Sequence, residues 1–129
     1  MSTTHDTELA EAWRQMLERH ARVSCALDRA LEARHGIGSS EFEVLEQLAT
    51  AATDQCQMKV LSDLVHLSQS ALSRLVGRLE ADGLVTRAMC EHDRRGIYAS
   101  ITDEGRARYE AALPTHREVL ARTWADEHN

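Results

Sequence analysis

An amphipathic helix that is followed at once by two short β-prone runs is the feature that most constrains this fold. Ser68 is a typical helix N-cap, and the apolar residues after it recur at helical spacing: Ala71, Leu72, Leu75, Val76 and Leu79. Gly83 is typical of the C′ position that ends a helix, where Leu84 can pack back on Leu79. The hydrophobic period then changes from that of a helix to that of a strand.

The β-prone runs predict a hairpin. Val85–Met89 and Ile97–Ile101 both show approximate alternation of apolar and polar residues. The segment between them is polar and charged and holds Asp93, Arg94 and Arg95. We therefore expect two short strands with two arginines at the tip of the hairpin.

A long helix is predicted before this unit, from Thr7 to His35. Apolar residues recur at helical spacing, no Gly or Pro interrupts them, and Gly36 supplies a stop. At 1.5 Å per residue such a helix spans roughly 40 Å, more than a monomer of 129 residues can cover. A dimer interface is therefore favoured over a purely internal core helix.

The other segments are also predicted mostly as helices. Ser40 and Glu43 have the spacing of a capping box, Ala51–Gln57 reads as a polar loop, and Lys59–Val65 reads as a short helix that buries Leu61, Leu64 and Val65. After the hairpin, Thr102 caps a further helix, and Pro114 is placed at the start of a last helical segment whose apolar face holds Val119, Leu120 and Trp124.

Composition supports the same class of fold. Aromatic residues make up 4% of the chain, with 6 Gly and 1 Pro, which suits a core of Leu, Val and Ala in helices. We predict one mainly α domain over residues 1–129, with a small β-hairpin wing. A winged helix-turn-helix covers about residues 40–102, between helical dimerisation parts at about 7–35 and 103–129.

The net charge of −6 is unevenly distributed. Residues 1–58 carry 5 Arg and 10 acidic residues, whereas residues 59–108 carry 8 basic and 7 acidic residues. Binding to double-stranded DNA requires local positive charge near the phosphates, and a basic protein overall is not needed. The acidic total is therefore a weak objection to DNA binding.

The polar side of the helix that begins after Ser68 predicts contact with DNA. It presents Gln69, Ser70, Ser73, Arg74 and Arg78, opposite the apolar stripe. In a helix-turn-helix the second helix enters the major groove, where Gln and Arg make bidentate contacts with base edges. Gly77 removes bulk on this side, and Arg78 suits a phosphate. The alternative is an ordinary surface helix, which its place between a short helix and a wing disfavours.

The hairpin tip supplies a second candidate contact. Arg94 and Arg95 can enter a narrow minor groove, and Asp93 is expected to pair with a neighbouring arginine and orient the tip. The alternative is a solvated charged turn.

Two segments resemble the MarR family of transcription regulators: SQSALSRLVGRLEADGLVTR (68–87) and EHDRRGIYASITDEG (91–105). The resemblance implies an obligate dimer that reads a pseudo-palindrome. Ser68, Gln69, Ser70, Ser73 and Arg74 match the positions that enter the major groove, and Arg95 matches the minor-groove arginine. It also implies repression and release by a small aromatic or phenolic ligand, or a response to cysteine oxidation. The last helix is shorter than is usual, which leaves the extent of the C-terminal dimer contact open.

Other functions are disfavoured by the motifs. The chain has no HExxH, CxxC or GxSxG sequence, so we expect no enzyme, cofactor or metal site, although a Cys–His pair that is distant in sequence stays open. A thiol- or metal-responsive regulator of the same fold is an alternative, with Cys25, Cys56 and Cys90 as candidate thiols. A winged-helix protein-interaction module is another. The residues that would bind an effector are not defined.

The sequence also bears on localisation. No apolar stretch is long enough to span a membrane, and the polar N-terminus is unlike a secretory signal. Three cysteines without a disulfide pattern suit a reducing compartment. We therefore expect a cytoplasmic protein without a membrane contact.

Overall fold

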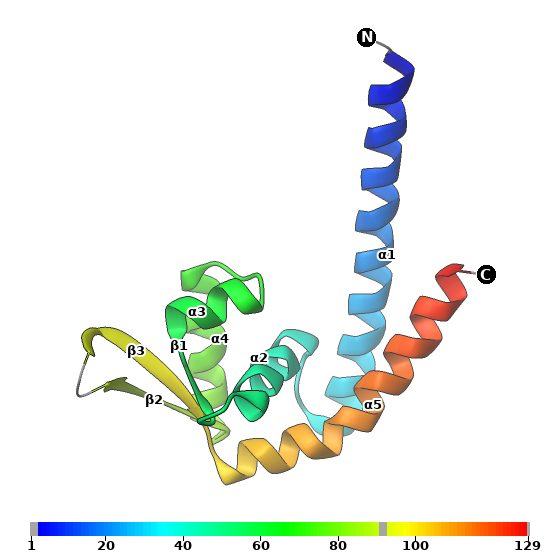
Figure 1. The fold of residues 1–129 in the computed structure, drawn as a ribbon. Coiled ribbons are helices and arrows are strands. Elements are labelled where there is room, and N and C mark those ends of the chain that lie inside the picture. Colours follow the sequence, from blue (N-terminus) through cyan, green and yellow to red (C-terminus); the bar gives the residue numbers. More distant parts are fainter. Residues whose placement is uncertain (1–2, 91–92, 129) are drawn as a thin grey trace.

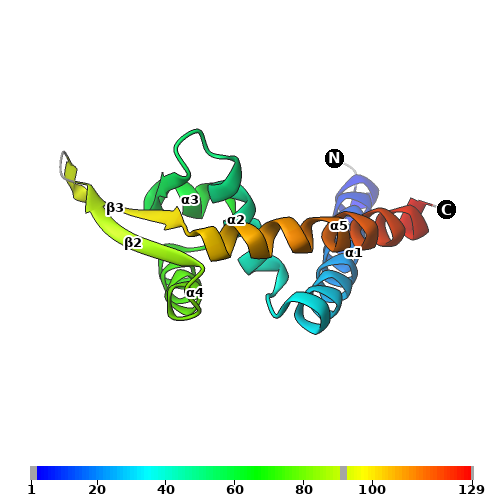
Figure 2. The ribbon, with the colours of Figure 1, turned by 90° about the horizontal axis from the view of Figure 1, so that it is seen from below.

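The computed structural model describes residues 3–90 and 93–128, and among these it leaves out the side chains of residues 90, 93–95 and 125–128. The elements run in the order α1 (Thr3–His35), α2 (Ser39–Thr50), β1 (Gln55–Gln57), α3 (Met58–Leu64), α4 (Gln69–Ala81), β2 (Val85–Cys90), β3 (Asp93–Ile101) and α5 (Asp103–His128). The sheet lies with α2, α3 and α4 at one end of the molecule, and α1 lies at the other (Figure 1). Figure 2 shows α5 running between the two ends. The predicted class, mainly α with a small β wing, is confirmed.

Helix α1 is the long helix that the sequence predicts, and it begins four residues earlier than expected, at Thr3. Its buried side chains are Val23, Leu27 and Leu31, and they pack in the C-terminal half against α5. The N-terminal turns project beyond the other described elements (Figure 1), whereas Arg19, near the middle of the helix, lies over the ring of Trp124 on α5.

Helix α2 does not begin with the predicted capping box at Ser40 and Glu43, so that prediction is wrong. Gly38 is the N-cap, and its N–H donates to Oε1 of Glu41 over 3.0 Å. The N–H of Ser39 donates to Oδ1 of Asp28 on α1 over 2.7 Å. A carboxylate from another helix thus satisfies a free donor of the first turn, and the helix begins earlier than local sequence suggests.

The predicted polar loop at 51–57 is wrong at its end, because Gln55–Gln57 forms strand β1. This strand pairs antiparallel with β3, with Cys56 opposite Ala99, so β3 lies at the centre of a three-stranded sheet with β2 on its other side. Two glutamines around one cysteine carry little β signal by themselves, and the free edge of β3 supplies the hydrogen bonds that order them.

The next two helices form the helix-turn-helix. In α3, Leu61 is buried as predicted, but Leu64 is wrongly predicted and is 48% exposed. In α4 the predicted ends are confirmed: Oγ of Ser68 accepts from the N–H of Ala71 over 3.1 Å. At the other end, Gly83 has a φ of 78°, and the N–H of Leu84 donates to the carbonyl of Leu79 over 2.9 Å.

The wing is the predicted hairpin, with longer strands than expected. Strand β2 extends to Cys90 and β3 begins at Asp93, and the register changes between Met89 and Cys90. Val85 and Ala99 are buried beneath the sheet, whereas Met89 and Ile97 pair across the strands and are 60% and 51% exposed.

Helix α5 continues through Pro114, so the prediction that a separate helix starts there is wrong. Thr102 caps the helix as predicted, since its Oγ1 accepts from the N–H of Gly105 over 3.0 Å. The helix changes direction partway along (Figure 1), as expected where a proline removes one backbone hydrogen bond and its ring crowds the preceding turn. On the last segment, Val119 is buried and Trp124 is 47% exposed.

The core joins the two ends of the molecule. Its largest fully buried side chains include Phe42 and Leu45 of α2, Leu72 and Leu79 of α4, and Leu31 of α1. Within the described ranges, none of the helices is both long enough and apolar enough to cross a lipid bilayer.

Candidate nucleic-acid interface

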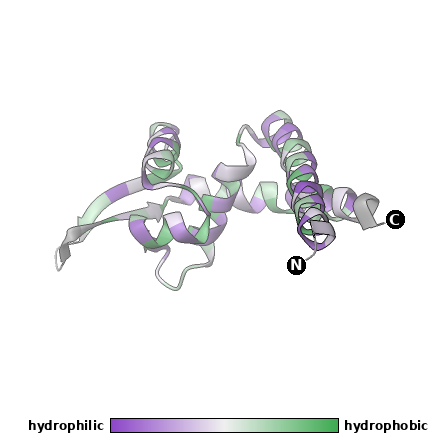
Figure 3. Cartoon of the chain, turned by 90° about the horizontal axis from the view of Figure 1, so that it is seen from above, coloured by the Kyte–Doolittle hydropathy of each residue, from purple (hydrophilic) through white to green (hydrophobic). Residues whose placement is uncertain are grey.

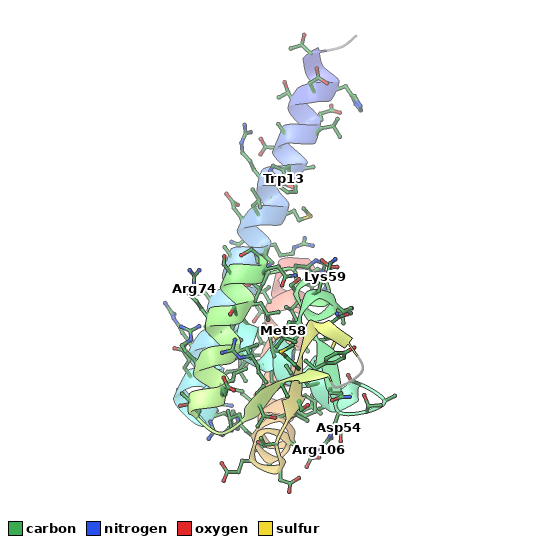
Figure 4. All side chains as sticks on the ribbon, turned by 90° about the vertical axis from the view of Figure 1, so that its left-hand side faces the viewer. Trp13, Asp54, Met58, Lys59, Arg74 and Arg106 are labelled. Carbon is green, nitrogen blue, oxygen red and sulfur yellow. The ribbon has the colours of Figure 1, made fainter. Side chains whose placement is uncertain are left out.

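Helix α4 has two chemically distinct faces. Leu72, Val76 and Leu79 are fully buried, and Leu75 is 5% exposed. The opposite face holds the side chains that the sequence assigned to DNA, and all of them are exposed: Ser68, Gln69, Ser70, Ser73, Arg74 and Arg78. In Figure 4 Arg74 lies at the outer edge of α4 and points away from the rest of the molecule. The α4 residues therefore form one continuous polar surface.

The two serines at the start of α4 are already partly engaged. Oγ of Ser68 accepts the cap hydrogen bond from Ala71 and lies 3.4 Å from Oγ of Ser70. Ser68 can still contact a phosphate, since a hydroxyl has two acceptor sites. Within a single chain, Ser68 serves as the N-cap of α4.

Gln69 is held by the preceding helix. Its Nε2 donates to Oγ of Ser62 over 2.8 Å, and the hydroxyl of Ser62 in turn donates to the carbonyl of Lys59 over 2.9 Å. Ser62 is 4% exposed, so this contact lies in the angle between α3 and α4. The side chain of Gln69 is exposed, and one end of its amide is fixed to the protein.

Ser73 is held by the wing. Nη1 of Arg87 on β2 donates to Oγ of Ser73 over 3.2 Å and to its carbonyl over 3.4 Å. The same guanidinium pairs with Oε1 of Glu80, with Nη2 at 3.1 Å. Because Glu80 balances its charge, Arg87 fixes β2 to α4 and is not one of the exposed cations of the surface.

Arg74 and Arg78 border an open depression of about 540 Å³, whose other lining residues are Ser40, Leu67, Ala71 and Leu75. Both guanidinium groups stand at the surface, where phosphates can reach them. Gly77 lies between them along the helix, and a methyl group there would meet Nη2 of Arg87 at 3.7 Å, an ordinary contact distance. The protein itself therefore does not require a glycine at this position.

The predicted wing contacts at Asp93, Arg94 and Arg95 have side chains outside the description. The backbone places Asp93 opposite Cys90 in the hairpin. The minor-groove roles of the two arginines and the orienting role of Asp93 stay predictions.

A cluster on α2 and α5 joins the helix-turn-helix to the long helices. The ring of Phe42 stacks on His116, with centroids 4.2 Å apart, and Oε2 of Glu46 accepts from Arg117 and, over 3.1 Å, from the hydroxyl of Tyr109. Burial raises the pKa of Tyr109, and the hydrogen bond to Glu46 raises it further. These contacts hold α2 against α5.

The candidate thiols lie apart from the α4 surface or outside the description. Cys25 is exposed on α1 and Cys56 is half-buried on β1, where burial raises its thiol pKa. The side chain of Cys90 is not described. Among the side chains that the structure describes, no three from His, Cys, Asp or Glu gather as metal ligands would.

Sequence reasoning missed Ser62 and Arg87, although a signal for each was present. Met58, Leu61, Ser62 and Val65 fall at i, i+3, i+4 and i+7, which places Ser62 on the buried side of its helix. Arg87 follows the buried Val85 by two residues, so strand alternation turns both toward α4.

Residues 35–96 match the family model described as MarR family. The HTH-type transcriptional regulator YkoM of Bacillus subtilis is 29% identical over 91 residues, which is 70% of this chain and 58% of YkoM. The match spans about 60% of the length of the first curated relatives, between 58% and 61%.

Solved structures agree. Sco3205 of Streptomyces coelicolor, a MarR family regulator solved in complex with DNA, is 30% identical with a TM-score of 0.84, over 93% of this chain and 75% of Sco3205. AbsC, a MarR family regulator of the same organism, is 29% identical with a TM-score of 0.82, over 98% of this chain and 82% of AbsC. Fold, sequence and the two-faced helix α4 agree, and this chain belongs to the MarR family of transcriptional regulators.

Proposed function

We propose that this protein binds double-stranded DNA in a sequence-specific manner, with α4 in the major groove and the wing in the adjacent minor groove. The observation that carries the proposal is the exposed polar face of α4 over a fully buried apolar stripe. Gln69, Ser70, Ser73 and Arg74 are the proposed base-reading and backbone contacts, with Arg78 on a phosphate. Arg94 and Arg95 are the proposed wing contacts, with Asp93 orienting the tip.

We further propose that the protein acts as a homodimer. None of the residues from Thr3 to Arg22 is buried, and Leu9, Trp13, Met16 and Leu17 are 47–57% exposed. Figure 3 shows hydrophobic and hydrophilic residues alternating along α1. A lone helix of this composition is marginal in water, and a second copy that packs along the same stripe would cover it. Two copies of α4 would then read a pseudo-palindromic operator.

The first test is a gel shift on the DNA that flanks the gene of this protein, repeated at rising salt concentration. Binding through phosphates predicts a steep linear fall of log K with log salt. Footprinting of the bound site should give two half-sites about one helical turn apart. A salt-independent interaction, or no preference over unrelated DNA, would contradict the proposal and favour a protein-interaction module.

Repression and release by a small aromatic or phenolic ligand are a finer part of the proposal. One relative, the homoprotocatechuate degradative operon repressor of Escherichia coli, is 29% identical over 77% of this chain. A reporter under the footprinted operator should be silenced by the protein, and candidate phenols should release the DNA in the gel shift. Release by peroxide, lost in Cys90→Ser, would favour a thiol sensor instead, and release by zinc would favour a metal sensor.

A further inference from the structure

We propose that Ser62 is a positioning residue for base recognition: it fixes the amide of Gln69 so that this side chain selects adenine at one position of each half-site. The inference rests on the proposed function, since it requires α4 to lie in the major groove. It concerns a residue of α3 that does not itself reach the DNA.

The orientation of the Gln69 amide follows from the hydrogen bonds of Ser62. A serine hydroxyl has one proton, and that of Ser62 is given to the carbonyl of Lys59 over 2.9 Å. Oγ of Ser62 can therefore only accept, and the group 2.8 Å away must be the NH2 end of Gln69. The two ends of a glutamine amide are usually assigned from such networks, and here one orientation satisfies both hydrogen bonds.

This arrangement leaves Gln69 with one free N–H and a free carbonyl oxygen. Adenine offers an acceptor, N7, and a donor, the N6 amino group, in the major groove, so it matches that pair. Guanine offers two acceptors, N7 and O6. An unrestrained glutamine could turn both N–H groups toward guanine, but Ser62 already takes one of them.

The position of Gln69 suits this role. It is the first residue of α4, directly after the N-cap Ser68, and the N-terminal residues of a recognition helix contact base edges. Ser62 is 4% exposed, so DNA does not compete for its hydroxyl. The side chain of Gln69 thus enters the groove with its orientation already chosen, which avoids the entropy loss of ordering it on binding.

The experiment measures binding of the intact protein to its footprinted operator, with each base pair of the half-site replaced by the other three. The wild type should show one A·T position where a G·C pair lowers affinity by roughly 5- to 150-fold, the usual range for a mismatch. Gln69→Ala should remove this preference. Ser62→Ala should reduce the difference in affinity between A·T and G·C at this position to within about threefold. The preferences at other positions should stay unchanged.

Three further variants sharpen the test. The double variant Ser62→Ala, Gln69→Ala should bind no worse than Gln69→Ala alone, because both substitutions remove the same base contact. Gln69→Glu, a change at an exposed side chain, should shift the preference at the same position toward cytosine, whose N4 amino group donates. Ser62→Thr keeps the hydroxyl and should retain the preference for adenine.

Ser100→Ala is the matched control. Oγ of Ser100 on β3 also meets a glutamine, donating to Oε1 of Gln55 over 3.5 Å, but this pair lies on the sheet and not on α4. This variant should keep the base preference of the wild type. If Ser62→Ala weakens binding equally for all base pairs, its role is structural and the inference is overturned. If the wild type binds specifically but shows no Gln69-dependent A·T position, the inference fails alone, whereas loss of specific binding altogether would count against the proposed function.

Discussion

Helix α4 and the N-terminal half of α1 are both exposed, but for opposite reasons. On α4 the exposed residues are polar. Gln69 is hydrogen-bonded to Ser62, and Ser73 is hydrogen-bonded to Arg87. On α1 the exposed residues include Leu9, Trp13, Met16 and Leu17, and the helix extends beyond the rest of the molecule (Figures 1 and 4).

Contacts within one chain are enough to order the surface of α4, whereas they leave the apolar side chains of the N-terminal half of α1 uncovered. The polar face of α4 is well solvated and ordered by contacts within one chain, so it can meet DNA as it stands. Each Å² of apolar surface that stays in water forgoes about 25 cal/mol of stabilisation by burial. Exposed apolar patches of this kind commonly mark an interaction site. We therefore expect mutations of α1 to act through assembly, and mutations of α4 to act through DNA.

The largest effect is expected for Trp13→Glu. A charge placed in an apolar dimer contact costs several kcal/mol, which corresponds to about 100-fold or more in the dimerisation constant. Sedimentation should show a monomer at concentrations where the wild type is a dimer, with lower helix content by circular dichroism.

Gln15→Glu is the control for that variant, because residue 15 lies on the opposite side of α1 from Trp13 at 100° per residue. It should leave the dimer intact. Equal masses for Trp13→Glu and the wild type would show that the α1 stripe is not the interface.

The second largest effect is expected at Gly105, where the start of α5 packs closely against the wing. A methyl group at Gly105 would lie 2.1 Å from the carbonyl oxygen of Leu84 and 2.9 Å from Cγ1 of Ile101, so the backbone must move. Gly105→Ala should destabilise the protein by about 1–3 kcal/mol, seen as a Tm lower by roughly 3–15 °C.

Gly77→Ala is the matched glycine on α4. Because a methyl group fits there, the change should stabilise the helix by about 1 kcal/mol and raise the Tm. If this variant also loses DNA affinity, the glycine serves the approach of α4 to the groove. A Tm for Gly105→Ala equal to that of the wild type would contradict the seating of α5.

The third effect concerns the α4 surface itself. Arg74→Ala should weaken operator binding by about 1–3 kcal/mol, or roughly 5- to 150-fold, with the Tm and the dimer mass unchanged. Arg29→Ala, an exposed arginine on α1, provides the comparison in the same anisotropy assay. Equal affinities for the two variants would remove Arg74 from the interface.

The smallest effect comes from Tyr109, in the cluster that joins α2 and α5. Burial, then the bond to Glu46, raises its pKa in the folded protein, so the stability it contributes is present below its unfolded pKa of about 10 and is lost as the pH rises above that value. Tyr109→Phe should lower the free energy of unfolding by about 1 kcal/mol at pH 8. The difference from the wild type should shrink at pH 11, measured by urea denaturation. A difference that grows with pH would contradict the sign.

Much of the site was predictable from sequence because its signals are local. The cap at Ser68, the stop at Gly83 and the apolar stripe of α4 each depend on residues within a few turns, and together they fixed which side of the helix faces outward. The start of α2, strand β1 and the continuous α5 were predicted wrongly. Each depends on a contact with another element: Asp28 of α1 for α2 and β3 for β1, with α5 packed along both α1 and α2.

Sequence alone was enough to predict the outward residues of α4, the two strands of the wing and the family, because helix caps, periodicity and motif spacing are properties of neighbouring residues. The hydrogen-bond partners of the exposed α4 side chains became evident only from the tertiary structure. Ser62 and Arg87 come from different elements than α4, and hydrogen-bond partners are chosen by proximity in space, which chain order does not specify. For Gln69 that placement leaves one free N–H and a free carbonyl oxygen, on which the proposed preference for adenine rests.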